Sequence, residues 1–316
     1  MLTGERETGS PDFDYEVMYL LDAPGERIAA LRADLSVIGD SVAVVGDGAG
    51  LWNVHVHCTD VGAAIEAGLQ AGRPHRITVV RFADQVETAG PEGRFTRARA
   101  VLIVTGGGEP AEVARSAGGD VLERAGGRPV DEAELAAALA GTRARHVVLL
   151  PSDSELTPVA ERAANTARRD GQDVLVVPTS SVLQGLAALA VHDPERRPGE
   201  DVVAMAEAAA CCRTAGLLVA ESEALTWVGR CEPGDVLGIS DGEVVLIAPD
   251  LSVGALWLAH RMLTAGGEIV TALLGAGVPD DVGEGLVADL RRTHPEVDTV
   301  VYRGDQTDFP LVLGVE

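Results

Sequence analysis

The chain has 316 residues, 46% of them hydrophobic and 3% aromatic, which is enough for two globular domains of ordinary size. Its net charge is −24 and it contains no lysine, which excludes a lysine-dependent P-loop and disfavours nucleic acid and anionic membrane surfaces as partners. It has four cysteines without a Cys-x-x-Cys pair, no signal peptide and no apolar run of membrane length, so we expect free thiols, no membrane span and a cytoplasmic location.

The first part of the chain predicts a small domain over residues 15–86, preceded by a flexible lead-in at residues 1–14. Its element order is βαββαβ, the split arrangement of a ferredoxin-like sandwich. The expected elements are a strand at 15–22, a helix at 25–38, strands at 41–46 and 51–58 joined by a turn at 47–50, a helix at 61–71 and a strand at 76–82.

The residue pattern of the sequence changes after the small domain. Residues 87–97 (ETAGPEGRFTR) are polar and predict a linker. Residues 98–316 alternate Val-rich strands with Ala-rich helices, which predicts a doubly wound, mostly parallel sheet. The first expected strands are 100–105, 120–123, 145–150 and 173–177, and the helices between and after them are 109–117, 131–140, 154–169 and 182–190.

A second, weaker boundary within the chain is expected near residues 192–200 (HDPERRPGE). Residues 98–316 are therefore predicted to form two α/β lobes. The predicted fold class is therefore α/β, with an α+β small domain ahead of a two-lobed α/β domain. Beyond the break we expect helices at 201–211, 253–263 and 281–292 and several strands, among them 236–239, 243–247, 268–274 and 297–302.

Two histidines stand as His-x-His in the predicted strand 51–58. Successive side chains of a strand point to opposite faces, so His55 and His57 share a face and Cys58 points away from it. Two imidazoles at this spacing can reach one zinc ion if a third ligand is supplied. The alternative is that both histidines make hydrogen bonds at a domain junction.

Polar residues follow two predicted strands of the larger domain. Ser152 comes after one strand, and Thr179 and Ser180 come after another. Ligands of open α/β sheets bind in the crevice at the carboxyl ends of the strands, so these side chains are candidates for holding a carboxylate or a phosphate. Helix N-capping is the commoner role of Ser and Thr at such places.

Two further features favour structural roles. The glycine-rich turn at 105–109 could hold an anion, but it lacks the spacing of a dinucleotide site. Cys211 and Cys212 are adjacent on a predicted helix, where neighbours point about 100° apart, and are interpreted as core residues. No G-x-S-x-G elbow occurs, and no residue is assigned as catalytic.

Several motifs in order resemble those of the fatty acid kinase A-subunit family. The segments YEVMYLL, GDS and VHVHCTD are similar to motifs of that family's middle domain. The later segments PTSSVLQGLAAL, GDVLGISDG and YRGDQTDFPLVLGVE resemble motifs of its C-terminal domain, which is DegV-like. The resemblance covers about residues 15–316.

The resemblance implies that ATP and the fatty acid are bound by different parts of the system. In the family, an N-terminal helical domain of dihydroxyacetone-kinase type binds ATP and magnesium, and the whole protein phosphorylates a fatty acid held by a separate DegV-like protein. Nothing in these 316 residues resembles that helical domain, so we expect no ATP site in this chain, whether it is a fragment or a short form. The family also implies a metal ligand at position 16, usually Cys, where this chain has Glu16.

Glu16 changes the expected ligand set to one carboxylate and two imidazoles. A His₂Glu set is acceptable to zinc and resembles sites that retain a water, although a carboxylate holds zinc less tightly than a thiolate. We therefore expect Glu16, His55 and His57 to be metal ligands, with zinc as the candidate ion.

Three functions remain open. The first is a non-catalytic part of a fatty acid kinase-like protein that docks a DegV-like fatty-acid-binding protein and a kinase domain, in cis or in trans. The second is a stand-alone lipid-binding module, and the third is a metal-dependent hydrolase built on Glu16, His55 and His57. The oligomeric state, a homodimer included, is left open.

Overall fold

The computed structural model describes residues 13–46, 50–81, 95–124 and 128–316. Most of the expected lead-in at 1–14, most of the expected turn at 47–50, residue 82 of the last expected small-domain strand and most of the expected linker at 87–97 lie outside the described residues.

The small domain, taken here as residues 13–81, has the predicted element order. It consists of β1 (Tyr15–Asp22), a short 3-10 turn and α1 (Ile28–Ile38), β2 (Gly39–Gly46), β3 (Leu51–Cys58), α2 (Val61–Ala71) and β4 (Arg73–Arg81). Its sheet runs β2-β3-β1-β4 with antiparallel neighbours, as the split βαβ arrangement requires.

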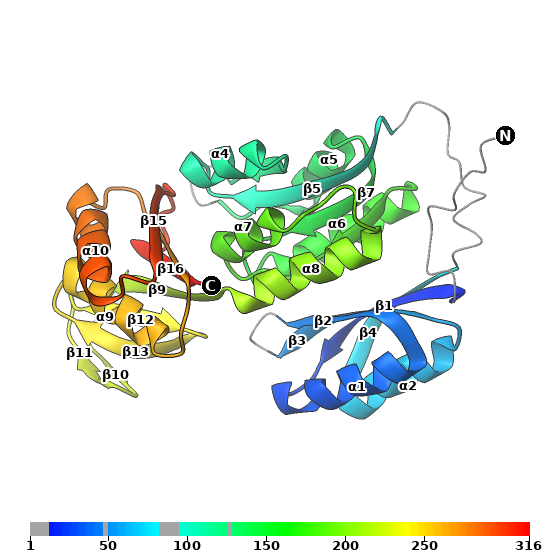
Figure 1. Ribbon diagram of the computed structural model, residues 1–316, viewed down its shortest axis with the longest axis horizontal. Helices are drawn as coiled ribbons and strands as arrows, with labels where there is room; N and C mark the ends of the chain where they lie inside the picture. Colours follow the sequence, from blue (N-terminus) through cyan, green and yellow to red (C-terminus); the bar gives the residue numbers. More distant parts are fainter. Residues whose placement is uncertain (1–12, 47–49, 82–94, 125–127) are drawn as a thin grey trace.

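One face of this sheet packs on α1 and α2. Alternate residues of β1 and β3, such as Val17 and Val56, join Leu31 and Leu35 of α1 in one buried cluster. Tyr19 donates a hydrogen bond to the Ala64 carbonyl of α2 at 3.1 Å. Figure 1 shows α1 and α2 on one side of the sheet and α8, from the next part of the chain, on the other.

The first lobe, residues 95–212, contains a parallel sheet in the order β6-β5-β7-β8. Helices cover both of its faces, which confirms the doubly wound arrangement: α5 and α6 pack on one side, and α4, α7 and α8 on the other. The strands are β5 (Arg97–Thr105), β6 (Asp120–Glu123), β7 (Ala144–Leu150) and β8 (Asp173–Val176), and the helices are α4 (Gly108–Ser116), α5 (Glu132–Gly141), α6 (Thr157–Arg169), α7 (Val182–Ala190) and α8 (Pro198–Cys211).

Two details of the first lobe refine the sequence-based elements. Helix α6 begins at Thr157 rather than at residue 154, with Pro158 in its first turn, where a missing N–H costs no hydrogen bond. Helix α8 follows the break expected near 192–200, yet its residues Met205 and Ala209 pack in the first lobe's core. The chain therefore passes to the second sheet at Cys212, after α8.

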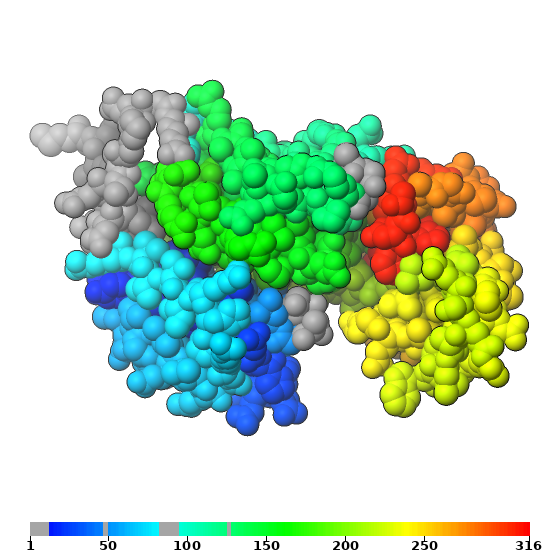
Figure 2. All heavy atoms as spheres, turned by 180° about the vertical axis from the view of Figure 1, so that it is seen from behind, coloured from blue at the N-terminus to red at the C-terminus, as the bar shows by residue number. Residues whose placement is uncertain are grey.

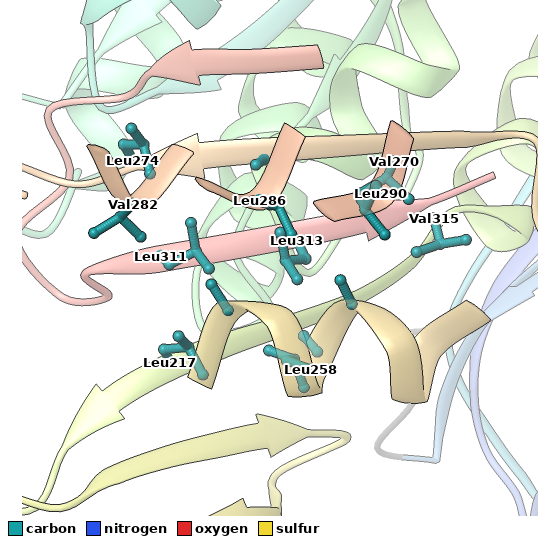
Figure 3. Packing of buried hydrophobic residues seen from close by; sticks show 14 of the residues in the cluster. Leu217, Leu258, Val270, Leu274, Val282, Leu286, Leu290, Leu311, Leu313 and Val315 are labelled. Carbon is teal, nitrogen blue, oxygen red and sulfur yellow. The ribbon is translucent and has the colours of Figure 1, made fainter. Parts of the chain in front are cut away.

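The second lobe, residues 213–316, is a mixed sheet in the order β13-β12-β9-β16-β14-β15. Helices α9 and α10 cover it, and Leu258, Leu286 and Leu313 lie in its core (Figure 3). Its elements are β9 (Arg213–Val219), β10 (Ala224–Thr226), β11 (Gly229–Cys231), β12 (Val236–Ser240), β13 (Glu243–Ala248), α9 (Leu251–Leu263), β14 (Ile269–Leu274), α10 (Asp280–Thr293), β15 (Asp298–Arg303) and β16 (Leu311–Val315).

The three parts lie side by side with the first lobe in the middle. Figure 2 shows the small domain and the second lobe on the same side of the first lobe, at its two ends. The small domain meets the first lobe through β2 and α8, and a buried apolar cluster from α7, β14 and β16 joins the two lobes. No helix among the described residues is both long and apolar enough to cross a bilayer.

Candidate functional site

The antiparallel register of β1 and β3 brings Glu16 to the two histidines. Glu16 stands directly opposite His57, and Met18 stands opposite His55. Because side chains two apart share a face, Glu16, His55 and His57 all point away from α1 and α2. Glu16 Oε1 lies 3.6 Å from His55 Nδ1 and 3.8 Å from His57 Nε2.

The three side chains are sealed between the small domain and the first lobe. Their exposed fractions are 7% for Glu16, 4% for His55 and 7% for His57. The amino end of α8 covers them, because a Cβ placed on Gly199 would stand 3.2 Å from His57 Cε1. Arg168 of α6 adds a positive charge on the first-lobe side of Glu16.

His55 is buried without the hydrogen bonds that a buried imidazole normally makes. Neither of its ring nitrogens has a hydrogen-bond partner among the described residues. Burial of an unbonded polar group costs free energy, so such a group calls for an explanation. One ligand atom each from Glu16, His55 and His57 lie within 4.8 Å of one another, and this donor set fits a divalent cation.

Electrostatics favour the protonation states that a metal needs. Burial alone would raise the pKa of Glu16, but His57, His55 and Arg168 more than offset it and hold that pKa below its usual value. Burial lowers the pKa of His55, against a smaller opposing effect of Glu16. An ionised carboxylate and a neutral imidazole are the ligand forms that bind metal ions.

Neighbouring residues complete the environment. Asp40 Oδ1 of β2 lies 3.5 Å from His57 Nδ1, a position from which a carboxylate can orient the ring. Cys58 lies in the cluster beneath the sheet with α1 and α2, on the face opposite the histidines, as strand alternation predicts. A thiol is therefore not part of this site.

Of the three Ser and Thr residues expected to bind a ligand, Ser152 and Thr179 contact each other, whereas Ser180 contacts Gln184. The Ser152 N–H donates to Thr179 Oγ1 at 2.7 Å, so these two loops meet at the ends of β7 and β8. Thr179 is 1% exposed, and Ser180 Oγ donates to Gln184 Oε1 at 3.0 Å. Ser181, not one of the three, caps α7. Ligand binding by Ser152, Thr179 and Ser180 stays a prediction.

A crevice of about 340 Å³ lies between the two lobes, beside the carboxyl ends of β5 and β7. Its lining combines Arg124 with acidic residues of both lobes: Asp153, Glu155, Asp305 and Asp308. Arg124 pairs with Asp153 at 2.7 Å and with Asp308 at 3.9 Å. The sequence indicated a crevice at the strand ends beside Ser152, but it did not predict that Arg124 and acidic residues of both lobes line it.

The glycine-rich turn at 105–109 of the first lobe packs directly against the second lobe. A Cβ on Gly108 would stand 2.6 Å from the Arg303 carbonyl oxygen, so only glycine permits this approach. The Arg303 N–H donates to Glu109 Oε2 at 2.6 Å. The turn thus has the structural role that the sequence favoured.

Comparison with known proteins covers both parts of the chain. The family model of the fatty acid kinase A-subunit-like (FakA-like) middle domain matches residues 12–89, and that of the FakA-like C-terminal domain matches residues 100–316. Protein YloV of Bacillus subtilis is 24% identical over 317 aligned positions, covering 96% of this chain and 56% of YloV. Protein SH1689 of Staphylococcus haemolyticus is 22% identical, with 90% of this chain and 53% of that protein covered. The chain thus spans about half the length of these relatives.

Two solved structures share the fold of much of this chain. The DegV family protein Cg2579 from Corynebacterium glutamicum has a TM-score of 0.52 and 19% identity, covering 69% of this chain and 95% of that one. Protein TM841 from Thermotoga maritima, described as having a fatty acid binding function, has a TM-score of 0.53 and 13% identity, covering 70% of this chain and 99% of that one.

Proposed function

The chain belongs to the fatty acid kinase A-subunit-like family, and from that membership we propose that it serves the phosphorylation of fatty acids as a docking part. In this role it binds a DegV-like fatty-acid-binding protein and positions it beside a kinase domain, supplied in cis or in trans. The chain itself holds neither the fatty acid nor ATP.

The acidic crevice is the observation that carries this choice. A free fatty acid has an anionic head group, and the crevice between the lobes presents Asp153, Glu155, Asp305 and Asp308 to any entering ligand. Arg124, the cation among them, already contacts Asp153 and Asp308. Like charges at short range oppose the binding of a carboxylate, so a DegV-like fold with this crevice suits a partner protein better than a free fatty acid.

A lipid-binding module is the second candidate. The TM-scores with Cg2579 and TM841 favour it, because the second of these is described as binding fatty acid. The packed cluster between the lobes opposes it: Leu183, Ala187 and Leu273 fill the junction of α7 and β14 with side chains.

We also propose that Glu16, His55 and His57 hold a divalent cation, with zinc the best fit to two imidazoles and a carboxylate. The ion would neutralise a buried carboxylate and fix β1 and β3 against α8. Burial of all three ligands leaves little room for a substrate, so a domain-positioning ion is favoured over a metal-dependent hydrolase.

The docking proposal is tested with a DegV-like fatty-acid-binding protein loaded with oleate. Calorimetric titration should show a saturable complex with this chain. Native mass spectrometry after incubation with oleate should show this chain free of lipid. Retention of one oleate per chain would instead support the lipid-binding module. Acyl phosphate formed by this chain alone with ATP and Mg²⁺ would contradict a docking role.

A double variant tests the reason given for lipid exclusion. Asp153→Asn with Asp308→Asn leaves Arg124 without its two carboxylate contacts, so oleate uptake should rise above that of the parent chain. Asp34→Asn with Glu66→Gln removes the same charge from exposed helix positions of the small domain and should leave uptake unchanged. Equal uptake by the two double variants would show that the crevice carboxylates are not the cause.

A further inference from the structure

Two histidines of the second lobe face each other across α9 and α10. His260 lies near the end of α9, and His294 directly follows α10. His260 Nδ1 and His294 Nε2 are 3.1 Å apart, and the ring centroids are 5.1 Å apart. Both side chains are partly open to solvent, with exposed fractions of 36% and 29%.

A carboxylate stands behind each ring. His260 Nε2–H donates to Asp289 Oδ2 at 2.7 Å, and His294 Nδ1 lies 3.4 Å from Glu296 Oε1. Arg292 fixes Asp289 from the other side at 2.5 Å. The Asp289 carboxylate is thus held in place by contacts with both His260 and Arg292.

The carboxylates favour one tautomer of each ring. The nitrogen that faces a carboxylate carries the proton of a neutral imidazole, and the other nitrogen then presents a lone pair. In those tautomers the lone pairs of His260 Nδ1 and His294 Nε2 face each other, and the two atoms are 3.1 Å apart. Two ring nitrogens at this distance can share one proton in a hydrogen bond, or both can donate their lone pairs to one cation.

We propose that His260 and His294 form a binding site for a divalent transition-metal ion, with Asp289 and Glu296 orienting the two rings. Two metal–nitrogen bonds of about 2.1 Å that meet at roughly 90 to 110° end about 3.0 to 3.4 Å apart, a range that includes the observed separation. A carboxylate behind each ligating histidine is the usual second partner of such a ring. Imidazole pairs suit Zn²⁺, Cu²⁺ and Ni²⁺, and the solvent-open side leaves the other coordination positions to water.

This site is separate from the one formed by Glu16, His55 and His57, because its ligands come from the second lobe rather than the small domain. It also does not depend on the proposed docking function. A metal at this position would join the end of α9 to the end of α10 on the surface of the lobe.

The test counts Zn²⁺ ions by competition with a chromophoric chelator. The parent chain should bind one more equivalent than His294→Gln and His260→Gln. The control is His146→Gln, which removes a ring that is also paired with a carboxylate, Asp173 at 2.8 Å, but has no such imidazole opposite it in the described structure. That variant should keep the full count. Circular dichroism checks that each variant is folded.

Two more measurements keep the outcome decisive. Cu²⁺ bound to the parent chain should show hyperfine coupling to two imidazole nitrogens in the electron paramagnetic resonance spectrum, and His294→Gln should lose it. Asp289→Asn keeps both ligands and should weaken metal binding by roughly 10- to 100-fold. An unchanged metal count in His294→Gln, or an equal loss in His146→Gln, would overturn the proposal.

Discussion

Asn53 Nδ2 donates a hydrogen bond of 2.7 Å to the carbonyl oxygen of Val176. Asn53 belongs to β3 of the small domain, two residues before His55, and Val176 ends β8 of the first lobe. The bond thus ties the strand that carries both histidines to the sheet of the neighbouring lobe. It fixes the position of the candidate metal ligands relative to α6 and α8.

We expect Asn53→Ala to loosen the contact between the small domain and the first lobe. Without the Asn53 amide, the carbonyl oxygen of Val176 loses its side-chain hydrogen-bond donor, which costs about 1 to 3 kcal/mol of stability. Urea unfolding should show the small domain separating at lower denaturant concentration. Asn165→Ala is the control, because Asn165 accepts a hydrogen bond from Arg168 of its own helix. Equal effects of the two variants would argue against a role for Asn53 in domain coupling.

Glu16→Gln should weaken zinc binding at the buried centre. The change keeps the shape of the side chain and removes its charge, so the loss should reach at least the roughly 10- to 100-fold caused by removing an orienting partner. Glu16→Cys should bind zinc more tightly than the parent, because thiolate is the stronger zinc ligand. Chelator competition in a His294→Gln background restricts the measurement to this centre.

Glu66→Gln, at an exposed position, is the control for Glu16→Gln and should bind zinc like the parent. Zinc affinity unchanged in Glu16→Gln would remove Glu16 from the ligand set.

Leu313→Ala should destabilise the second lobe strongly. Leu313 is 0% exposed in β16 and lies in the cluster shared by α9 and α10, so the change costs about 2 to 5 kcal/mol. Leu225→Ala, on an 86% exposed side chain of β10, should change stability by less than about 0.5 kcal/mol. Denaturant unfolding measures both. Similar losses would mean that Leu225 is covered in solution.

One of the four cysteines should react in the native protein. Cys211 is exposed, so its interpretation as a core residue is wrong, whereas Cys58, Cys212 and Cys231 are buried. Burial raises the pKa of Cys58, and it raises the pKa of Cys212 to about 12, which suppresses the reactive thiolate. Ellman's reagent at pH 8 should therefore titrate one thiol in the native chain and four in denaturant. Cys211→Ser should abolish the native reaction, and residual native labelling in that variant would contradict the burial of the others.

Glu161 should make stability depend on pH. Burial raises its pKa above the ordinary 4.5, with Arg168 and Arg76 acting in the opposite direction. The folded state therefore binds this proton more tightly, so the stability it contributes is present below about pH 4.5 and is lost as pH rises through the raised pKa. Glu161→Gln should be more stable than the parent at pH 8, and the difference should shrink towards pH 4. A difference that grows on acidification would contradict the sign.

The local sequence pattern predicts only part of the candidate metal centre. Period-two alternation predicts that His55 and His57 share a face and that Cys58 does not, and the structure places them so. Glu16 entered the ligand set through the family resemblance, since no spacing rule links it to residues about forty positions away. The antiparallel register that sets it opposite His57 supplies the physical link.

The sequence by itself determined the order of helices and strands, the parallel character of the first sheet and the face of each strand side chain, because these depend on neighbours within a few residues. The tertiary structure decided which lobe holds α8, how Arg124 and Asp308 meet in the acidic crevice, and how His260 comes to face His294. Such contacts join residues far apart along the chain. They depend on how whole faces pack to exclude water, and a local pattern fixes the face that each element offers but not the partner that covers it.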